Sequence, residues 1–112
     1  MIEHAQTLAD ELLEQWPHLR RSQRLADFER LPRQYMDDFF LELEARAQAD
    51  LVLALPEGER RMFVRLLAPD DGADLIQESP PHQREYLLGL MDDRTREEAS
   101  ALLHYREDVA AG

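Results

Sequence analysis

Prolines recur every 24 residues along this chain and divide it into copies of one pattern. Pro32, Pro56 and Pro80 hold the same place in three successive copies, and an apolar segment precedes each of them. A second apolar pair follows each proline at a constant offset, at 39–40, 63–64 and 87–88. Proline disfavours helix in the residue before it and is tolerated in the first turn of the next helix. A 24-residue period with two apolar segments per copy therefore predicts repeated pairs of short helices.

The apolar spacing predicts helices at 2–16, 18–31, 33–43, 44–55, 57–67, 68–79, 82–91 and 92–104. Most span roughly 15 Å at 1.5 Å per residue, and helices this short are marginal alone in water. They must be held by stacking on their neighbours. No segment alternates apolar and polar residues as a strand does. The sequence thus predicts an all-α solenoid or superhelix, with these residues in its core: Phe39, Phe63, Leu66, Leu75, Ile76 and Leu87.

The acidic composition argues against several classes of partner. The 112 residues include 24 Asp and Glu against 13 Lys and Arg, which gives a formal net charge of −11. Nucleic acids require a basic surface, and anionic membrane surfaces attract one, so we expect neither as a partner. No apolar run is long enough to cross a bilayer, and the N-terminus lacks the apolar core of a signal peptide. We expect a soluble, cytoplasmic chain with no direct membrane insertion.

The sequence contains no recognisable motif of catalytic residues. There is no cysteine for a thiolate site, and the four histidines share no short metal-ligand spacing. The four glycines form no phosphate-binding loop. Acid–base catalysis by paired carboxylates needs a cleft that separates their pKa values, and short exposed helices rarely build one. We therefore expect no enzymatic activity.

Carboxylates gather in four places: 37–38, 70–74, 92–93 and 107–108. For 92–93, helix capping is the simplest interpretation. Asp70 and Asp71 likewise suit a first helical turn, where the helix dipole favours negative charge. Asp74 lies one turn beyond Asp70, a like-charge relation that costs about 0.2–0.5 kcal/mol on a helix surface. Carboxylates without Cys or His suit a hard cation such as Mg²⁺, which prefers one or two carboxylates together with retained waters.

Several segments resemble the cytoplasmic N-terminal domain of MgtE-type magnesium channels, most clearly from residue 31 to 112. They are the helix-pair repeat with its Leu-Pro joints, Asp70-Asp71-x-Ala73-Asp74, Asp92-x-Arg94-Thr95-Arg96-x-Glu98, and the tail Tyr105-x-Glu107-Asp108-x-Ala110-x-Gly112. The resemblance implies a right-handed superhelix. It also implies an N domain at 1–104, followed at 105–112 by the start of the connection to a CBS domain that is absent from this chain.

The resemblance further implies a Mg²⁺-sensing regulatory role. The N domain would close on CBS domains of the same polypeptide when Mg²⁺ bridges their acidic surfaces, and closure would favour the shut pore. Positions matching the family's metal ligands are Asp38, Asp70 and Asp74, with Asp38 in a position where glutamate also serves. Mg²⁺ binding by this chain alone would be weak, because the site is shared with the CBS domains. The parent would be a homodimeric plasma-membrane or inner-membrane protein with this domain in the cytoplasm.

Three positions depart from the family pattern: Ser79, Arg106 and Ala111. Two other interpretations stay open, a flagellar motor switch-like module and a helical adaptor with no metal role. In an adaptor the acidic residues would serve only solubility. The tail Glu107-Asp108-x-Ala110 speaks against the motor-switch interpretation, and the sequence after residue 112 would distinguish all three.

Overall fold

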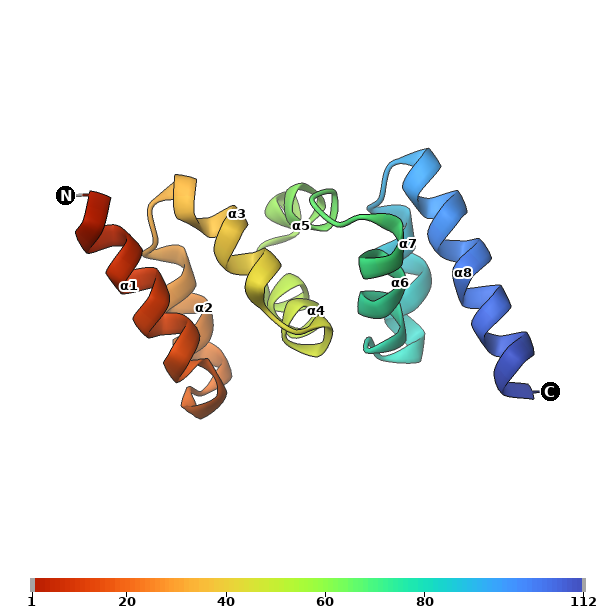
Figure 1. Cartoon of the computed structure of the whole chain (residues 1–112), viewed down its shortest axis with the longest axis horizontal. Coiled ribbons are helices and arrows are strands. Elements are labelled where there is room, and N and C mark those ends of the chain that lie inside the picture. The colour runs from red at the N-terminus through yellow and green to blue at the C-terminus, as the bar shows by residue number, and fades with distance from the viewer. Residues whose placement is uncertain (1, 112) are drawn as a thin grey trace. The chain divides into compact units, whose positions relative to one another are not determined.

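The computed structural model describes the backbone of residues 2–111 and the side chains of residues 6–109. All regular elements in the described backbone are helices, so the all-α prediction is confirmed (Figure 1). The elements are α1 (Ile2–Gln15), η1 (Trp16–His18), α2 (Arg21–Glu29), α3 (Arg33–Glu42), α4 (Ala45–Ala54), α5 (Glu57–Val64), α6 (Pro69–Gln77), η2 (Pro81–Gln83), α7 (Arg84–Gly89) and α8 (Asp93–Ala111).

The helices begin at regular intervals of the sequence. α2, α4, α6 and α8 begin at residues 21, 45, 69 and 93, which are 24 residues apart. Pro32, Pro56 and Pro80 lie between successive helices, and we call these segments the proline joints. The backbone hydrogen bonds at the joints recur at the same interval. Each proline carbonyl accepts a hydrogen bond at 2.9 Å from the N–H three residues later: Tyr35 to Pro32, Glu59 to Pro56 and Gln83 to Pro80. Each residue before a proline donates to the carbonyl three residues earlier: Leu31 to Phe28, Leu55 to Val52 and Ser79 to Ile76.

Several helix boundaries differ from the sequence prediction. His18 belongs to the 3₁₀ turn η1 and Leu19 is extended, so the helix predicted at 18–31 begins only at Arg21. Consecutive prolines at 80 and 81 remove two backbone donors, and a 3₁₀ turn therefore precedes the short α7. α8 continues past His104 to Ala111 because no proline or glycine interrupts this stretch.

The chain forms two compact units, Met1–Glu44 and Ala45–Gly112, and each has its own core. In the first unit α1 packs against α3. Three buried rings meet there: Trp16 and Phe39 lie edge to face with centroids 5.1 Å apart, and Phe28 lies 5.8 Å from Phe39. Because aromatic side chains bury large areas and favour such tilted contacts, this cluster is the main apolar core of the first unit.

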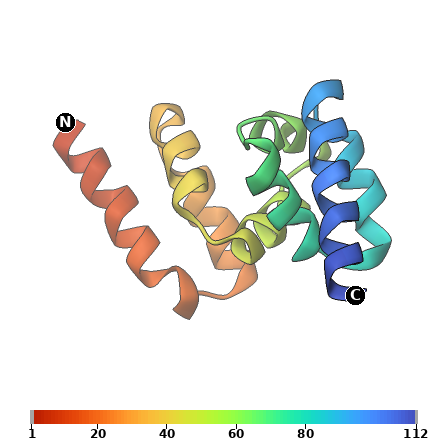
Figure 2. The same cartoon turned by 45° about the vertical axis from the view of Figure 1, so that its right-hand side comes forward.

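In the second unit α6 is central, with contacts to α4, α7 and α8. Figures 1 and 2 both show the blue α8 alongside α6 and α7. The largest fully buried side chains of this unit are Val52, Leu55, Phe63, Val64, Leu75, Ile76, Leu87 and Met91.

Five of the six residues predicted from the sequence to be buried are buried, and Leu66 is the exception. Leu66 is half-buried because α5 ends at Val64. The chain then turns, and Leu67 takes the buried position instead.

Candidate metal-binding surface

Helix α6 buries one side and exposes carboxylates on the other. Pro69 occupies its first turn, where a missing N–H costs nothing, and the acidic residues of that turn face solvent. Ala73, Leu75 and Ile76 are buried on the opposite side. Gly72 permits close packing there, because a Cβ at this position would lie 3.1 Å from the Cε of Met91.

Asp70 and Asp74 are both exposed and lie one turn apart on α6, as the sequence predicted. The carboxylate of Asp74 also has a partner that the sequence did not reveal. Arg106 of α8 donates from Nη1 to Asp74 Oδ1 at 2.9 Å and, from the same nitrogen, to Gln77 Oε1. A cation therefore already binds Asp74, and Gln77 supplies a second oxygen to it.

Asp38, the third candidate, lies on α3 in the first unit and is exposed. Its neighbour Asp37 is half-buried, and Oδ1 of Asp37 is buried without a hydrogen-bond partner among the described residues. Asp70 and Asp74 thus share one helix, whereas Asp38 belongs to the other unit.

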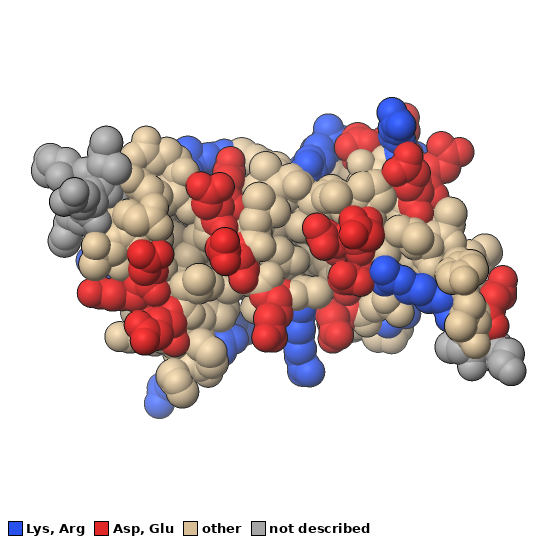
Figure 3. All heavy atoms as spheres, viewed as in Figure 1, with Lys and Arg blue, Asp and Glu red and all other residues tan. Residues whose placement is uncertain are grey.

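The charge and the donor atoms of these residues suit Mg²⁺, but the residues supply only part of the ligands that a bound ion needs. Within residues 6–109, no group of three or more His, Asp or Glu side chains is gathered closely enough to hold a metal ion. Asp70 and Asp74 offer carboxylate oxygens, the donors that Mg²⁺ prefers, and Mg²⁺ needs only one or two of them. In the view of Figure 3, acidic side chains form several separate clusters on the visible surface of each unit.

Residues 5–108 match the family described as the MgtE intracellular N domain. The chain belongs to this family. The match confirms the resemblance inferred from the sequence. A search of curated proteins finds no match.

The MgtE N domain described here is also similar to a solved structure, the crystal structure of the cytosolic domain of the Mg²⁺ channel MgtE in complex with ATP. The two share 28% sequence identity, with a TM-score of 0.69 over 89% of this chain. The match covers 43% of the chain in that structure, so this MgtE N domain spans less than half of its length. No helix in the described part of the chain is both long and apolar enough to span a membrane.

Asp92 of this MgtE N domain has a structural role, as predicted: it caps the N-terminus of α8. Its Oδ1 accepts a hydrogen bond at 2.9 Å from the backbone N–H of Thr95, and its Oδ2 accepts one from the hydroxyl of Thr95 at 3.1 Å. The backbone bond from Thr95, followed by the hydroxyl bond, holds the pKa of Asp92 below its usual value. These bonds favour the charged carboxylate, which an N-cap position also stabilises.

The Asp92 cap leads to a prediction about how the stability of the domain depends on pH. Because its pKa is lower in the folded state, Asp92 adds stability above its unfolded pKa, near 4, and loses that contribution as the pH falls through the lowered folded value. Asp92→Asn keeps a capping side chain but does not titrate. We expect the stability advantage of the wild type over Asp92→Asn to be constant above about pH 5 and to shrink below about pH 4. Urea unfolding of both proteins across this range measures the difference, and parallel stability curves would contradict it.

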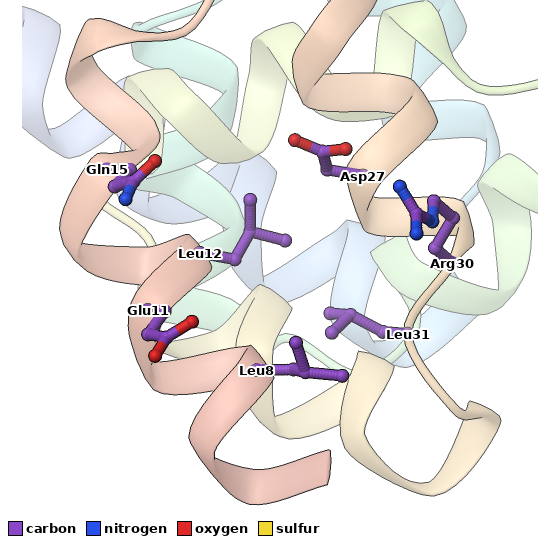
Figure 4. A pocket seen from close by; sticks show the side chains of 7 residues that line it. All are labelled: Leu8, Glu11, Leu12, Gln15, Asp27, Arg30 and Leu31. Atoms are coloured by element: carbon purple, nitrogen blue, oxygen red, sulfur yellow. The ribbon is translucent and has the colours of Figure 1, made fainter. Parts of the chain in front are cut away.

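A separate cavity of about 280 Å³ lies in the first unit of the MgtE N domain. Figure 4 shows Leu8, Leu12 and Leu31 forming its apolar part, with polar side chains from α1 and from the α2 side around them. None of the three predicted ligand residues lines this cavity. It is therefore distinct from the acidic surface of α6.

Proposed function

We propose that this MgtE N domain is a Mg²⁺-sensing regulatory domain of a magnesium channel. The observation that carries the proposal is the exposed Asp70–Asp74 pair on a helix whose other side is buried, within a chain of this family. Both residues are held on a regular helix and their oxygens face outward. They can therefore meet a second acidic surface without any rearrangement of the core.

Asp38, Asp70 and Asp74 are the proposed ligands, and CBS domains of the same polypeptide supply the facing carboxylates. Without a metal the two acidic surfaces repel each other. Two like charges 4 Å apart repel by about 1 kcal/mol in water and about 4 kcal/mol near a protein surface. Several such contacts exceed the few kcal/mol that separate two conformers of one protein. Bound Mg²⁺ supplies the positive charge that turns this repulsion into attraction, and the closed arrangement favours the shut pore.

The remaining parts of the proposal concern the architecture of the parent protein. The 24-residue spacing of helix starts supports a repeat of helix pairs, and the resemblance to the family implies that these pairs form a right-handed superhelix. Residues 1–104 then form the N domain, and residues 105–112 begin the connection to the first CBS domain. The parent is a homodimer in the plasma or inner membrane, with this domain on its cytoplasmic side. No catalytic role is proposed.

The test of this function is the double variant Asp70→Ala/Asp74→Ala in the full-length channel. Loss of two ligands is expected to raise the Mg²⁺ concentration at half-closure about tenfold or more, since even outer-shell partners of a metal site are worth 10–100-fold in affinity. Repulsion is relieved as well, but salt screens it partly. Mg²⁺-dependent protection from proteolysis near Val109 reports closure, because this residue is exposed on α8.

The matched control is Glu57→Ala/Glu97→Ala, which removes two exposed charges from the same unit, on α5 and α8, and leaves α6 unchanged. This control is expected to change the Mg²⁺ concentration at half-closure much less. An unchanged midpoint in Asp70→Ala/Asp74→Ala would mean that these carboxylates serve the helix terminus and solubility, as in a helical adaptor. A lower midpoint would mean that repulsion outweighs ligation at this surface.

A further inference from the structure

Arg106 places one nitrogen where two side-chain oxygens of α6 converge. Its Nη1 donates to Asp74 Oδ1 at 2.9 Å and to Gln77 Oε1. The Arg106 side chain is 31% exposed and that of Asp74 is 51% exposed, so the pair is partly shielded from water. A cation is thus already coordinated by a carboxylate and an amide oxygen of this helix.

The two oxygens extend the predicted acidic face. Asp70, Asp74 and Gln77 are spaced i, i+4 and i+7, so they lie on one stripe of α6. Carboxylate and amide oxygens are both donors for hard divalent cations. Gln77 therefore adds a neutral oxygen donor to a stripe on which sequence reasoning had identified only carboxylates.

This contact differs from the other two ion pairs that involve α8. Arg94–Glu98 and Arg96–Asp93 are local pairs between residues one turn apart, each with one partner almost fully exposed. The Arg106–Asp74 pair instead joins two helices that pack against each other, through residues 32 positions apart. It therefore holds the C-terminal part of α8 against α6.

We propose that Arg106 and a divalent cation exchange with each other on Asp74 and Gln77, so that Arg106 sets the apparent affinity of this surface for the ion. The inference rests on the proposed function and adds Gln77 to its ligand set. An ion bonded to Asp74 Oδ1 would lie within a few ångströms of the guanidinium, and the two positive charges would repel each other. Arg106 must then leave its two oxygen acceptors.

Release of Arg106 has a consequence for α8. Glu107 and Asp108 follow it near the helix C-terminus, and the last turn contains no basic residue. Negative charge at that end opposes the helix dipole. In the isolated chain the end of α8 therefore depends on the Arg106 contact.

The experiment titrates the 112-residue chain with Mn²⁺, a paramagnetic hard cation, and reads the broadening of the amide signals of α6. Mg²⁺ added in competition should restore those signals. In Arg106→Gln the Mn²⁺ midpoint is expected to fall about two- to fivefold, the range that an exposed ion pair provides. Arg106→Lys should keep the wild-type midpoint, because one ammonium nitrogen can reach both oxygens. In the Arg106→Gln background, Gln77→Ala should raise the midpoint.

The matched control is Arg96→Gln, which removes the same charge from α8 and breaks only the Asp93 pair. Its midpoint is expected to match the wild type. Equal midpoints in wild type and Arg106→Gln would overturn the exchange while leaving the proposed function intact. An equal fall in Arg106→Gln and Arg96→Gln would reduce the effect to net charge and also overturn it. Absence of any broadening on α6 in all of these proteins would overturn the exchange. The proposed function places only part of the site in this chain, so it is tested separately by the closure midpoint of the full-length channel.

Discussion

Replacement of Phe63 by alanine is expected to lower the free energy of unfolding by about 3–5 kcal/mol, the usual cost of removing a buried aromatic ring. Phe63 is 1% exposed and lies on α5, in the core of the second unit. Folded domains are stable by only about 5–15 kcal/mol, so this loss is a large part of the total. Urea unfolding followed by circular dichroism at the helix band measures it.

Leu66→Ala is the matched control, because this leucine lies three residues later but is only half-buried. Its truncation should cost less than about 2 kcal/mol, since fewer contacts are lost and the gap opens toward solvent. An equal or larger loss for Leu66 than for Phe63 would show that the core is arranged differently from this description.

Arg60→Ala is expected to cost about 2–3 kcal/mol, although the residue carries a charge and lies partly at the surface. Its Nε donates to the carbonyl of Leu55 at 2.8 Å and its Nη2 to that of Leu53 at 3.0 Å. Carbonyls at a helix C-terminus have no partner within the helix, so Arg60 satisfies the end of α4. Its Nη1 also donates to the hydroxyl of Tyr86 at 3.2 Å, and the guanidinium lies 5.8 Å from the centre of that ring. Thermal and urea unfolding of the variant measure the loss.

The control for this second variant is Arg61→Ala, which removes the same charge from the next, exposed position of α5. We expect a change within about 0.5 kcal/mol, as for most surface substitutions. Arg60→Lys should recover only part of the loss, because a single ammonium cannot reproduce the fork that meets two carbonyls. Equal effects at positions 60 and 61 would contradict the capping role.

The helices and most of the core could be predicted from the sequence because their signals are local. Proline positions mark the joints, and apolar residues at helical spacing mark the buried faces, so Phe39 and Leu87 were assigned correctly. Leu66 was misassigned because its spacing suits α5, while the helix ends two residues before it. Pattern alone does not say where a helix stops when no proline or glycine stands at the boundary.

The candidate site also has one part that could be predicted from the sequence and one part that could not. The shared face of Asp70 and Asp74 follows from a four-residue spacing within one helix. Arg106 pairs with Asp74 across 32 residues, and that contact depends on how α8 packs against α6. The only local signal for Gln77 as an additional oxygen donor was its i, i+4, i+7 spacing with Asp70 and Asp74. A neutral amide does not stand out by charge among carboxylates.

The proline joints have a consequence for how the length of such a domain can change. Each joint is closed by bonds within its own period, and the side chains repeat this: Arg84 donates to the carbonyls of Ser79 and Gln77 as Arg60 does to those of Leu55 and Leu53, one period earlier. Duplication or loss of a whole 24-residue period keeps every joint with its own donors and acceptors. An insertion of another length inside a helix shifts its apolar face relative to the next joint. The length of such a domain therefore changes by whole helix pairs.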